Sequence, residues 1–233
     1  MKITLQSWIR YKDRMARIDQ RAADELTAFV QRIGGYQGHE EETIEFAYGL
    51  ATRYGEAAAA AACEMYDSTA KGAGVSVPPA EPADTATYSE TAKAVRGAAK
   101  RSDKVIPQAV SRLVKQAGAD TVLENADRDG AQFAWIPAGD TCAFCLMLAS
   151  NGWQYQSKKA MKNGHAEHIH ANCDCQYAVR FVEKGKIKGG VEGYDPDRYL
   201  EMYDSAEGDT WQEKVNSMRR EIDAEKRAKE EGE

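Results

Sequence analysis

The stretch "DTCAFCLMLASNGWQYQSKKAMKNGHAEHIHANCDCQY", residues 140–177, gathers most of the metal-ligand chemistry of this chain. It holds four of the five cysteines and three of the four histidines among the 233 residues. Such a concentration fits a redox pair, a set of disulfides, an active-site metal or a structural metal. These possibilities imply different proteins, and the surrounding sequence helps to separate them.

The first cysteine pair falls at the expected start of a helix. Asp140 is well placed to cap a helix over residues 141–150, which Asn151 and the glycine after it would end. Cys142 and Cys145, three residues apart, would then share one face of the first turn. A helix N-terminus favours negative charge and therefore favours the thiolate form that binds metal.

The second pair, Cys173 and Cys175, falls on an expected strand, where residues two apart share one face. Two convergent pairs on separate elements predict a tetrahedral structural zinc site. His165 and His168 are expected to be loop residues rather than ligands. Five side chains compete for the four positions, so four cysteines and three cysteines with one histidine both remain open, with Cys173 or His170 favoured as the spare residue. The candidates are Cys142, Cys145, His170, Cys173 and Cys175.

Other interpretations of the cluster lack a required feature. The cysteines could simply pack in a small core, since cysteine is often buried. A thioredoxin-like site needs a βαβ setting, which the helical pattern upstream does not supply. A zinc deaminase could use His165 and Glu167, but its paired cysteines should follow this triplet. An HNH-type nuclease requires a further histidine downstream of the first, and no histidine follows His170.

Composition limits the class of protein. Hydrophobic residues make up 42% and charged residues 29% of the chain, the net charge is −6, and the chain is long enough to fold without disulfides. No apolar run has the length of a membrane span, and the first residues lack the apolar core of a signal peptide. We therefore expect a reducing cytosol, where clustered cysteines bind metal more often than they form disulfides.

Residues 1–71 are predicted to form a helical hairpin, and residues 72–88 a proline-rich hinge. The apolar stripe of the first helix fits either an internal core or a docking surface for a partner. The second helix, over residues 41–70, has an alanine run in which Cys63 should be a small packed residue. The stripe of the first helix consists of Tyr11, Met15, Ile18, Ala22, Leu26, Phe29 and Ile33.

Residues 89–129 are predicted to form short helices over residues 89–100, 104–117 and 120–126, with Gly118 ending the middle one. This region is strongly basic, with Asp103 as its single acid between Lys93 and Lys115. The basic side chains fit either a solvated helix face or a surface that contacts DNA phosphates. They are Lys93, Arg96, Lys100, Arg101, Lys104, Arg112 and Lys115.

From residue 130 the pattern changes to alternation, which predicts three short strands around the cysteine helix, the last with one apolar face. Residues 130–183 would form this metal-binding module. Residues 184–233 would be a glycine-rich loop, a short helix and a C-terminal helix with a charged tail. Thr210 and Glu213 are expected to form a capping box at the start of the C-terminal helix. The apolar stripe of this helix consists of Trp211, Val215, Met218 and Ile222. The predicted fold class is α+β: a mostly helical N-terminal region, a small zinc-stabilised α+β module and a C-terminal helix.

The cysteine module also resembles a known family. Trp135, the run D-T-C-A-F-C at 140–145, the strand at 153–155 and the run H-A-N-C-D-C at 170–175 are similar to the C-terminal module of phage Mu F-like minor head proteins. That head-morphogenesis family of tailed phages has the pattern D-x-x-C-x-x-C followed by H-P-x-C-x-C. Ala171 replaces the usual proline. The helical N-terminal region before a proline-rich break is similar to members from Gram-positive phages or prophages.

This resemblance implies a non-enzymatic minor capsid protein that acts near the portal during virion assembly. Its implied partners are the portal and other phage head proteins, with packaged DNA as a further partner through Lys93–Lys115. It would be found in the host bacterial cytoplasm during assembly and then in the virion. No membrane or small-molecule substrate is expected. The alternative function is a zinc-dependent enzyme acting on nucleic acid, either HNH-like or deaminase-like.

Overall fold

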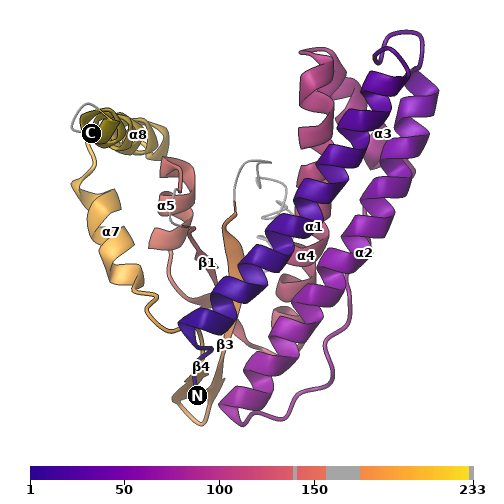
Figure 1. Ribbon diagram of the computed structural model, residues 1–233. Helices are drawn as coiled ribbons and strands as arrows, with labels where there is room; N and C mark the ends of the chain where they lie inside the picture. Colours follow the sequence, from indigo (N-terminus) through magenta and orange to yellow (C-terminus); the bar gives the residue numbers. More distant parts are fainter. Residues whose placement is uncertain (139–140, 156–173, 231–233) are drawn as a thin grey trace.

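The protein has an α+β fold, in which the N-terminal helices pack on one side of a small antiparallel sheet and the later helices lie on the other side (Figure 1). The computed structural model describes residues 1–138, 141–155 and 174–230. The predicted fold class is confirmed at this level. None of the helices in these ranges is both long enough and apolar enough to span a lipid bilayer.

The predicted helical hairpin is present as α1, Leu5–Arg32, and α2, Glu40–Ala73. The hydroxyl of Thr4 accepts a hydrogen bond from the backbone N–H of Ser7 and so caps the start of α1. Gly34, with a φ of 88°, helps to turn the chain out of this helix. Most of the apolar stripe of α1 is buried against the other helices, so the stripe forms an internal core rather than a free docking surface.

The next helices are α3, Tyr88–Ala99, and α4, Ile106–Arg128. The prediction that Gly118 ends a helix is wrong, because α4 passes through it without a break. A Cβ atom at Gly118 would lie 2.5 Å from Cε of Met15 and 3.4 Å from the carbonyl oxygen of Ala58. Glycine is therefore a close-packing residue here, which lets α1 and α2 approach α4.

Residues 74–87 are extended, as their prolines predict, and are fixed onto α4. The side chain of Asn125 accepts from the backbone N–H of Glu81 at 2.9 Å and donates to its carbonyl at 2.7 Å. The N–H of Ala83 donates to the hydroxyl of Thr121 at 3.0 Å. Hydrogen bonds thus hold the segment predicted as a hinge against α4. The helices on both sides of this segment share one hydrophobic core.

Within the described residues, four strands form one antiparallel sheet in the order β2-β1-β3-β4. Strand β4 lies in the segment that was expected to be a glycine-rich loop. Lys184 and Gly185 both have positive φ, at 50° and 75°, which makes the tight two-residue turn between β3 and β4. The strands are β1, Gln132–Ile136; β2, Gln154–Tyr155; β3, Gln176–Glu183; and β4, Lys186–Gly189.

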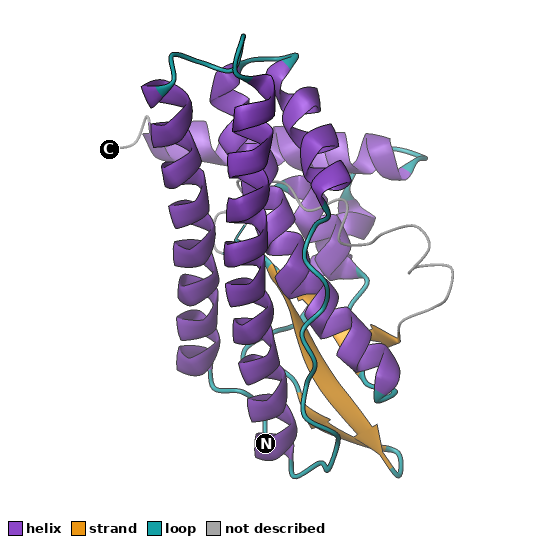
Figure 2. Ribbon diagram, turned by 90° about the vertical axis from the view of Figure 1, so that its right-hand side faces the viewer, coloured by secondary structure: helices purple, strands orange, loops and turns teal. Residues whose placement is uncertain are grey.

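The expected apolar face of the third strand is confirmed, because Tyr177, Val179 and Phe181 are all buried. The opposite face of β3 is also covered near the start of the strand. Phe181 on β3 packs edge-on against Tyr66 of α2, at 5.7 Å between ring centroids. The apolar face of β3 is therefore directed toward the long helices, which lie beside the strands in Figure 2. Gln176 and Ala178 point to the other face but are buried as well. On that other side lie α5, Ala143–Ser150; α7, Pro196–Ser205; and α8, Trp211–Glu230 (Figure 1).

Replacing Gly118 by valine should lower the free energy of unfolding by about 1–3 kcal/mol, because the new side chain would collide with Met15 and with the backbone of Ala58. The matched control is Gly49→Val on α2, where a Cβ atom meets nothing within 4 Å. This control should change the unfolding free energy by less than about 0.5 kcal/mol. Urea unfolding of both variants measures the difference, and equal losses would rule out close packing as the role of Gly118.

Candidate metal centre

Two of the predicted ligands lie at the start of α5. The helix begins at Ala143, two residues later than expected, because Cys142 is the N-cap residue with an extended backbone. The N–H of Leu146 donates to the carbonyl of Cys142 at 3.1 Å and closes the first turn. Cys145 follows within this turn, so both thiols lie at the start of α5. The prediction that they share one face of a helical turn does not apply directly, because Cys142 precedes the helix. Asp140, the expected cap, lies outside the described residues.

The third thiol comes from the opposite end of the sequence motif. Cys175 immediately precedes β3 and is 3% exposed. Its Sγ accepts a hydrogen bond from the backbone N–H of Ala138 at 3.2 Å and lies 2.9 Å from the hydroxyl oxygen of Thr141. Two residues that precede α5, Ala138 and Thr141, therefore contact this sulfur. Hydrogen-bond donors directed at sulfur stabilise a thiolate, which is the form that binds metal.

Cys142, Cys145 and Cys175 lie near one another, which brings together two parts of the chain about thirty residues apart. Three thiols of this kind fit the ligands that zinc prefers. Within the described ranges, however, no group of three histidine, cysteine or acidic side chains has the arrangement of a metal site. The predicted ligands His170 and Cys173, together with His165 and His168, lie outside the residues that the structure describes. The five-residue metal site therefore remains a prediction.

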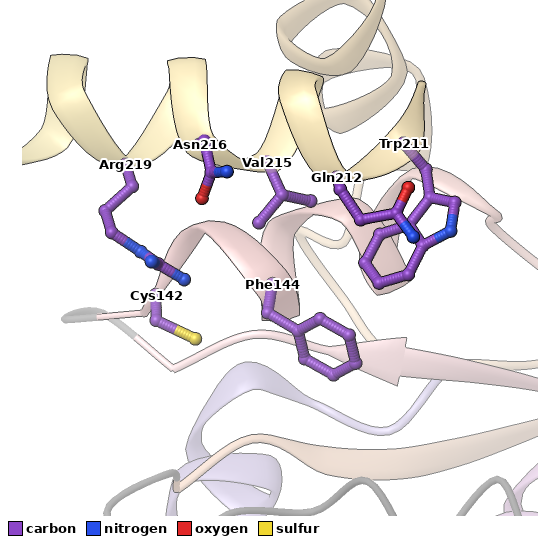
Figure 3. A pocket seen from close by; sticks show the side chains of 7 residues that line it. All are labelled: Cys142, Phe144, Trp211, Gln212, Val215, Asn216 and Arg219. Carbon is purple, nitrogen blue, oxygen red and sulfur yellow. The ribbon is translucent and has the colours of Figure 1, made fainter.

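Cys142 also borders an open groove between α5 and α8, with a volume of about 550 Å³. Figure 3 shows Arg219 extending from α8 toward Cys142 at one end of this groove, while Trp211 lies at the other end. The predicted stripe of α8 packs on α5 through Val215 and Met218, but Trp211 lies on the rim with 51% of its surface exposed. The remaining wall residues are Phe144, Val215, Gln212 and Asn216.

The predicted capping box at the start of α8 is present. The N–H of Glu213 donates to the hydroxyl of Thr210 at 3.3 Å, and the Glu213 carboxylate accepts from the N–H of Thr210 at 2.9 Å. These reciprocal bonds lower the pKa of Glu213, mainly through the backbone N–H of Thr210. The cap fixes where α8 begins and thereby its placement across α5.

Lys115 is not part of a solvated basic face, because only 4% of its surface is exposed. Its Nζ atom lies 3.0 Å from a carboxylate oxygen of Asp19 on α1 and 3.8 Å from one of Asp174, the residue just before Cys175. Arg96, a second member of the predicted basic surface, pairs with Glu41 on α2. The basic surface is thus smaller than the sequence indicated.

The Lys115–Asp19 pair was missed, although the sequence contains its signal. Asp19 lies four residues after Met15, at a position of α1 that faces the core, and Lys115 lies three residues before Gly118 on α4. An acid and a base at core-facing positions of two helices indicate a buried ion pair. Burial raises the pKa of Asp19, and attraction by Lys115 opposes this shift.

A family model described as VG15 protein matches residues 2–206, which is most of the chain. The chain belongs to the VG15 protein family. No curated protein and no solved structure matches it. The match to the VG15 family covers the long helices, the whole sheet and both cysteine pairs, and it ends before α8. One wall of the groove beside Cys142 is therefore built by a helix outside the matched region.

Replacing Lys115 by methionine in this VG15 family member should lower the free energy of unfolding by about 3–5 kcal/mol, because Asp19 would lose its buried counter-charge. Adding Asp19→Leu should restore most of that loss. The loss of unfolding free energy in Lys115→Met should also become smaller as the pH falls. A protonated Asp19 is neutral, so its burial is then less unfavourable.

The matched control is Arg14→Met, which removes an exposed ion pair between α1 and Glu64 of α2. It should change the unfolding free energy by less than about 1 kcal/mol. Denaturant unfolding at several pH values measures all three variants. A similar small loss for Lys115→Met would show that the buried pair does not contribute in the way described.

Proposed function

We propose that this VG15 family member is a structural protein of phage head assembly that acts near the portal, and that one zinc ion clamps its cysteine module. The proposal is supported by the residue pattern of the module, which resembles Mu F-like minor head proteins. The observation that carries it is that Cys142 and Cys145, at the start of α5, lie near Cys175, which precedes β3. A head-assembly module of this kind needs a rigid shape rather than a reactive centre.

The proposed ligands are Cys142, Cys145 and Cys175, with His170 or Cys173 as the fourth. The hydrogen bonds around Cys175 support its inclusion, which leaves His170 and Cys173 as the residues that compete for one position. Four protein ligands fill a tetrahedral zinc site and leave no position for a water or substrate. The role of the metal would then be structural, and the chain would not be an enzyme.

The clamp has a physical rationale in the small size of the module. Strand β2 has only two residues, and α5 has eight. Elements this short provide few apolar contacts, so metal ligation would hold α5 and β3 together at their joint. The long helices would supply the main bulk for contacts with other head proteins. Any contact with DNA would fall to the exposed part of the basic surface, such as Lys93, Lys100 and Lys104.

Protein purified under reducing conditions should contain about one zinc per chain. The metal should be lost in Cys145→Ser and in Cys175→Ser, because each removes a proposed ligand. Structural zinc supplies apparent binding energies of about 10–16 kcal/mol in small domains, so its removal should unfold the module. Elemental analysis and near-ultraviolet circular dichroism with and without chelator provide the two measurements.

The matched control is Cys63→Ser, since Cys63 lies on α2, away from the cluster, and is half-buried. This variant should keep its zinc and its chelator response. Absence of zinc from the parent protein would overturn the clamp. Nuclease or deaminase activity that depends on metal and on Glu167 would instead favour the enzymatic alternative.

The assembly role predicts that a tagged copy of the chain, produced in infected or induced cells, co-purifies with portal protein or procapsids. Cys145→Ser should reduce this co-purification, whereas Cys63→Ser should not. Mass spectrometry of purified procapsids and virions detects the chain directly. If the intact, zinc-loaded chain were missing from both particles, the zinc clamp could stand but the assembly role would be rejected.

A further inference from the structure

Arg180, in the middle of β3, is a cation held in partly buried surroundings. Its Nε donates to the side-chain oxygen of Gln132 on β1 at 2.7 Å. Its guanidinium carbon lies 4.9 Å from the ring centroid of Trp153, in a cation–π contact. Burial lowers the pKa of Arg180, so its charge lies where solvation is reduced. The fold therefore keeps a positive charge at this position at some energetic cost.

No carboxylate pairs with Arg180 among the residues that the structure describes. By contrast, Arg14, Arg53 and Arg128 all form ion pairs with nearby acids. The bond to Gln132 uses only Nε of Arg180, and within the described chain no hydrogen bond engages its two terminal nitrogens. A guanidinium in this state retains paired N–H donors, which match the two oxygens of a carboxylate.

The aromatic wall behind this cation is fixed in place. Trp153 packs edge-on against Tyr194 at 5.6 Å between centroids, and the Tyr194 hydroxyl donates to the carbonyl of Ala149 at 3.0 Å. A Cβ atom at Gly190 would lie 3.2 Å from the Trp153 ring, and the φ of Gly190 is 84°. Because these groups are already positioned, a ligand would lose little free energy in ordering them.

Apolar side chains lie beside Arg180 on the same face of the sheet. Strand register pairs Arg180 with Gln132, and Gln132 in turn with Tyr155, so these three share one face. Two residues further along β3, Val182 pairs with Ile187 of β4 on that face. Tyr155, Val182 and Ile187 are 52%, 38% and 60% exposed. The result is an exposed apolar surface next to a cation without an acidic partner.

We propose that this surface, formed by Tyr155, Arg180, Val182 and Ile187, binds a segment of a partner protein that carries a carboxylate flanked by apolar side chains. The carboxylate would accept hydrogen bonds from the terminal nitrogens of Arg180, and the apolar side chains would cover Val182 and Ile187. This binding surface is distinct from the cysteine cluster and does not require zinc.

The charge distribution favours an acidic protein segment over nucleic acid. Nucleic-acid surfaces neutralise several phosphates with several cations. The lysines of β4 do not add positive charge beside Arg180. In the strand register Lys186 lies opposite Glu183 and Lys188 opposite Phe181, which places both lysines on the other face of the sheet. The surface around Arg180 is therefore more apolar than basic.

Fluorescence anisotropy on the full chain can test this surface with a labelled peptide of alternating leucine and glutamate. The parent protein should bind this peptide more tightly than the same peptide with glutamine in place of glutamate, because only a carboxylate pairs with Arg180. Arg180→Gln should weaken binding about tenfold or more, and Arg180→Lys should weaken it less. Ile187→Ser, at a position that is 60% exposed, should also weaken binding.

The matched control is Lys186→Gln, which removes one positive charge from the other face of the same hairpin and should leave affinity within about twofold. Equal binding of the glutamate and glutamine peptides, or equal losses from Arg180→Gln and Lys186→Gln, would overturn the proposal. It would also be overturned if no peptide bound, or if short single-stranded oligothymidine bound more tightly than the glutamate peptide.

Discussion

The close packing of α4 against α1 and α2 at Gly118 is the constraint on which the rest of the structure depends. Helix α4 contacts α1, α2 and α3 and also reaches β1 and β3, so its position sets the surface on which the sheet lies. A side chain at Gly118 would push Met15 and Ala58 outward. Lys115, one helical turn away, would then move relative to Asp19, and the buried ion pair would lose its geometry.

Polar contacts convert this close approach into one specific register. The Tyr66 hydroxyl donates to the carbonyl of Asn125 at 2.9 Å and to the carboxylate of Asp129 at 2.8 Å, which fixes the far end of α4 against α2. A buried ion pair adds little net stability over apolar packing, because desolvation offsets most of the attraction. Its effect is selective: a shift of α1 against α4 by one turn would leave Lys115 and Asp19 buried without partners.

The sequence was sufficient where the signal was local. The stripes of α1 and α2, the capping box at Thr210 and the end of α5 near Asn151 follow from spacing and from capping chemistry within a few residues. The proximity of Cys142 and Cys145 also follows from a spacing of three. Each of these features requires only the geometry of one helix.

The sequence was insufficient where tertiary contacts determine the role of a residue. The sequence alone does not show whether Gly118 ends a helix or allows another helix to pack closely. Only the position of Met15 distinguishes the two cases. Lys115 belongs to a basic run in the sequence, but the placement of α1 buries it. Strand β4 depends on pairing with β3 rather than on its own pattern. The approach of Cys175 to α5 likewise depends on β3 lying beside β1, the strand that leads into α5.

Lys115 and Arg180 are both cations that lose solvation in the fold, but their surroundings differ. Both place a cation in surroundings that solvate it poorly, and in both cases neighbouring groups hold the side chain in place. Lys115 finds its counter-charge inside the chain, in Asp19 with Asp174 nearby, so the fold itself accounts for its burial. Arg180 has a neutral amide and an aromatic ring instead, which orient the guanidinium without neutralising it. Because Arg180 is only partly buried, it can keep its charge without an internal counter-ion, and the acidic partner segment that we propose would supply the carboxylate.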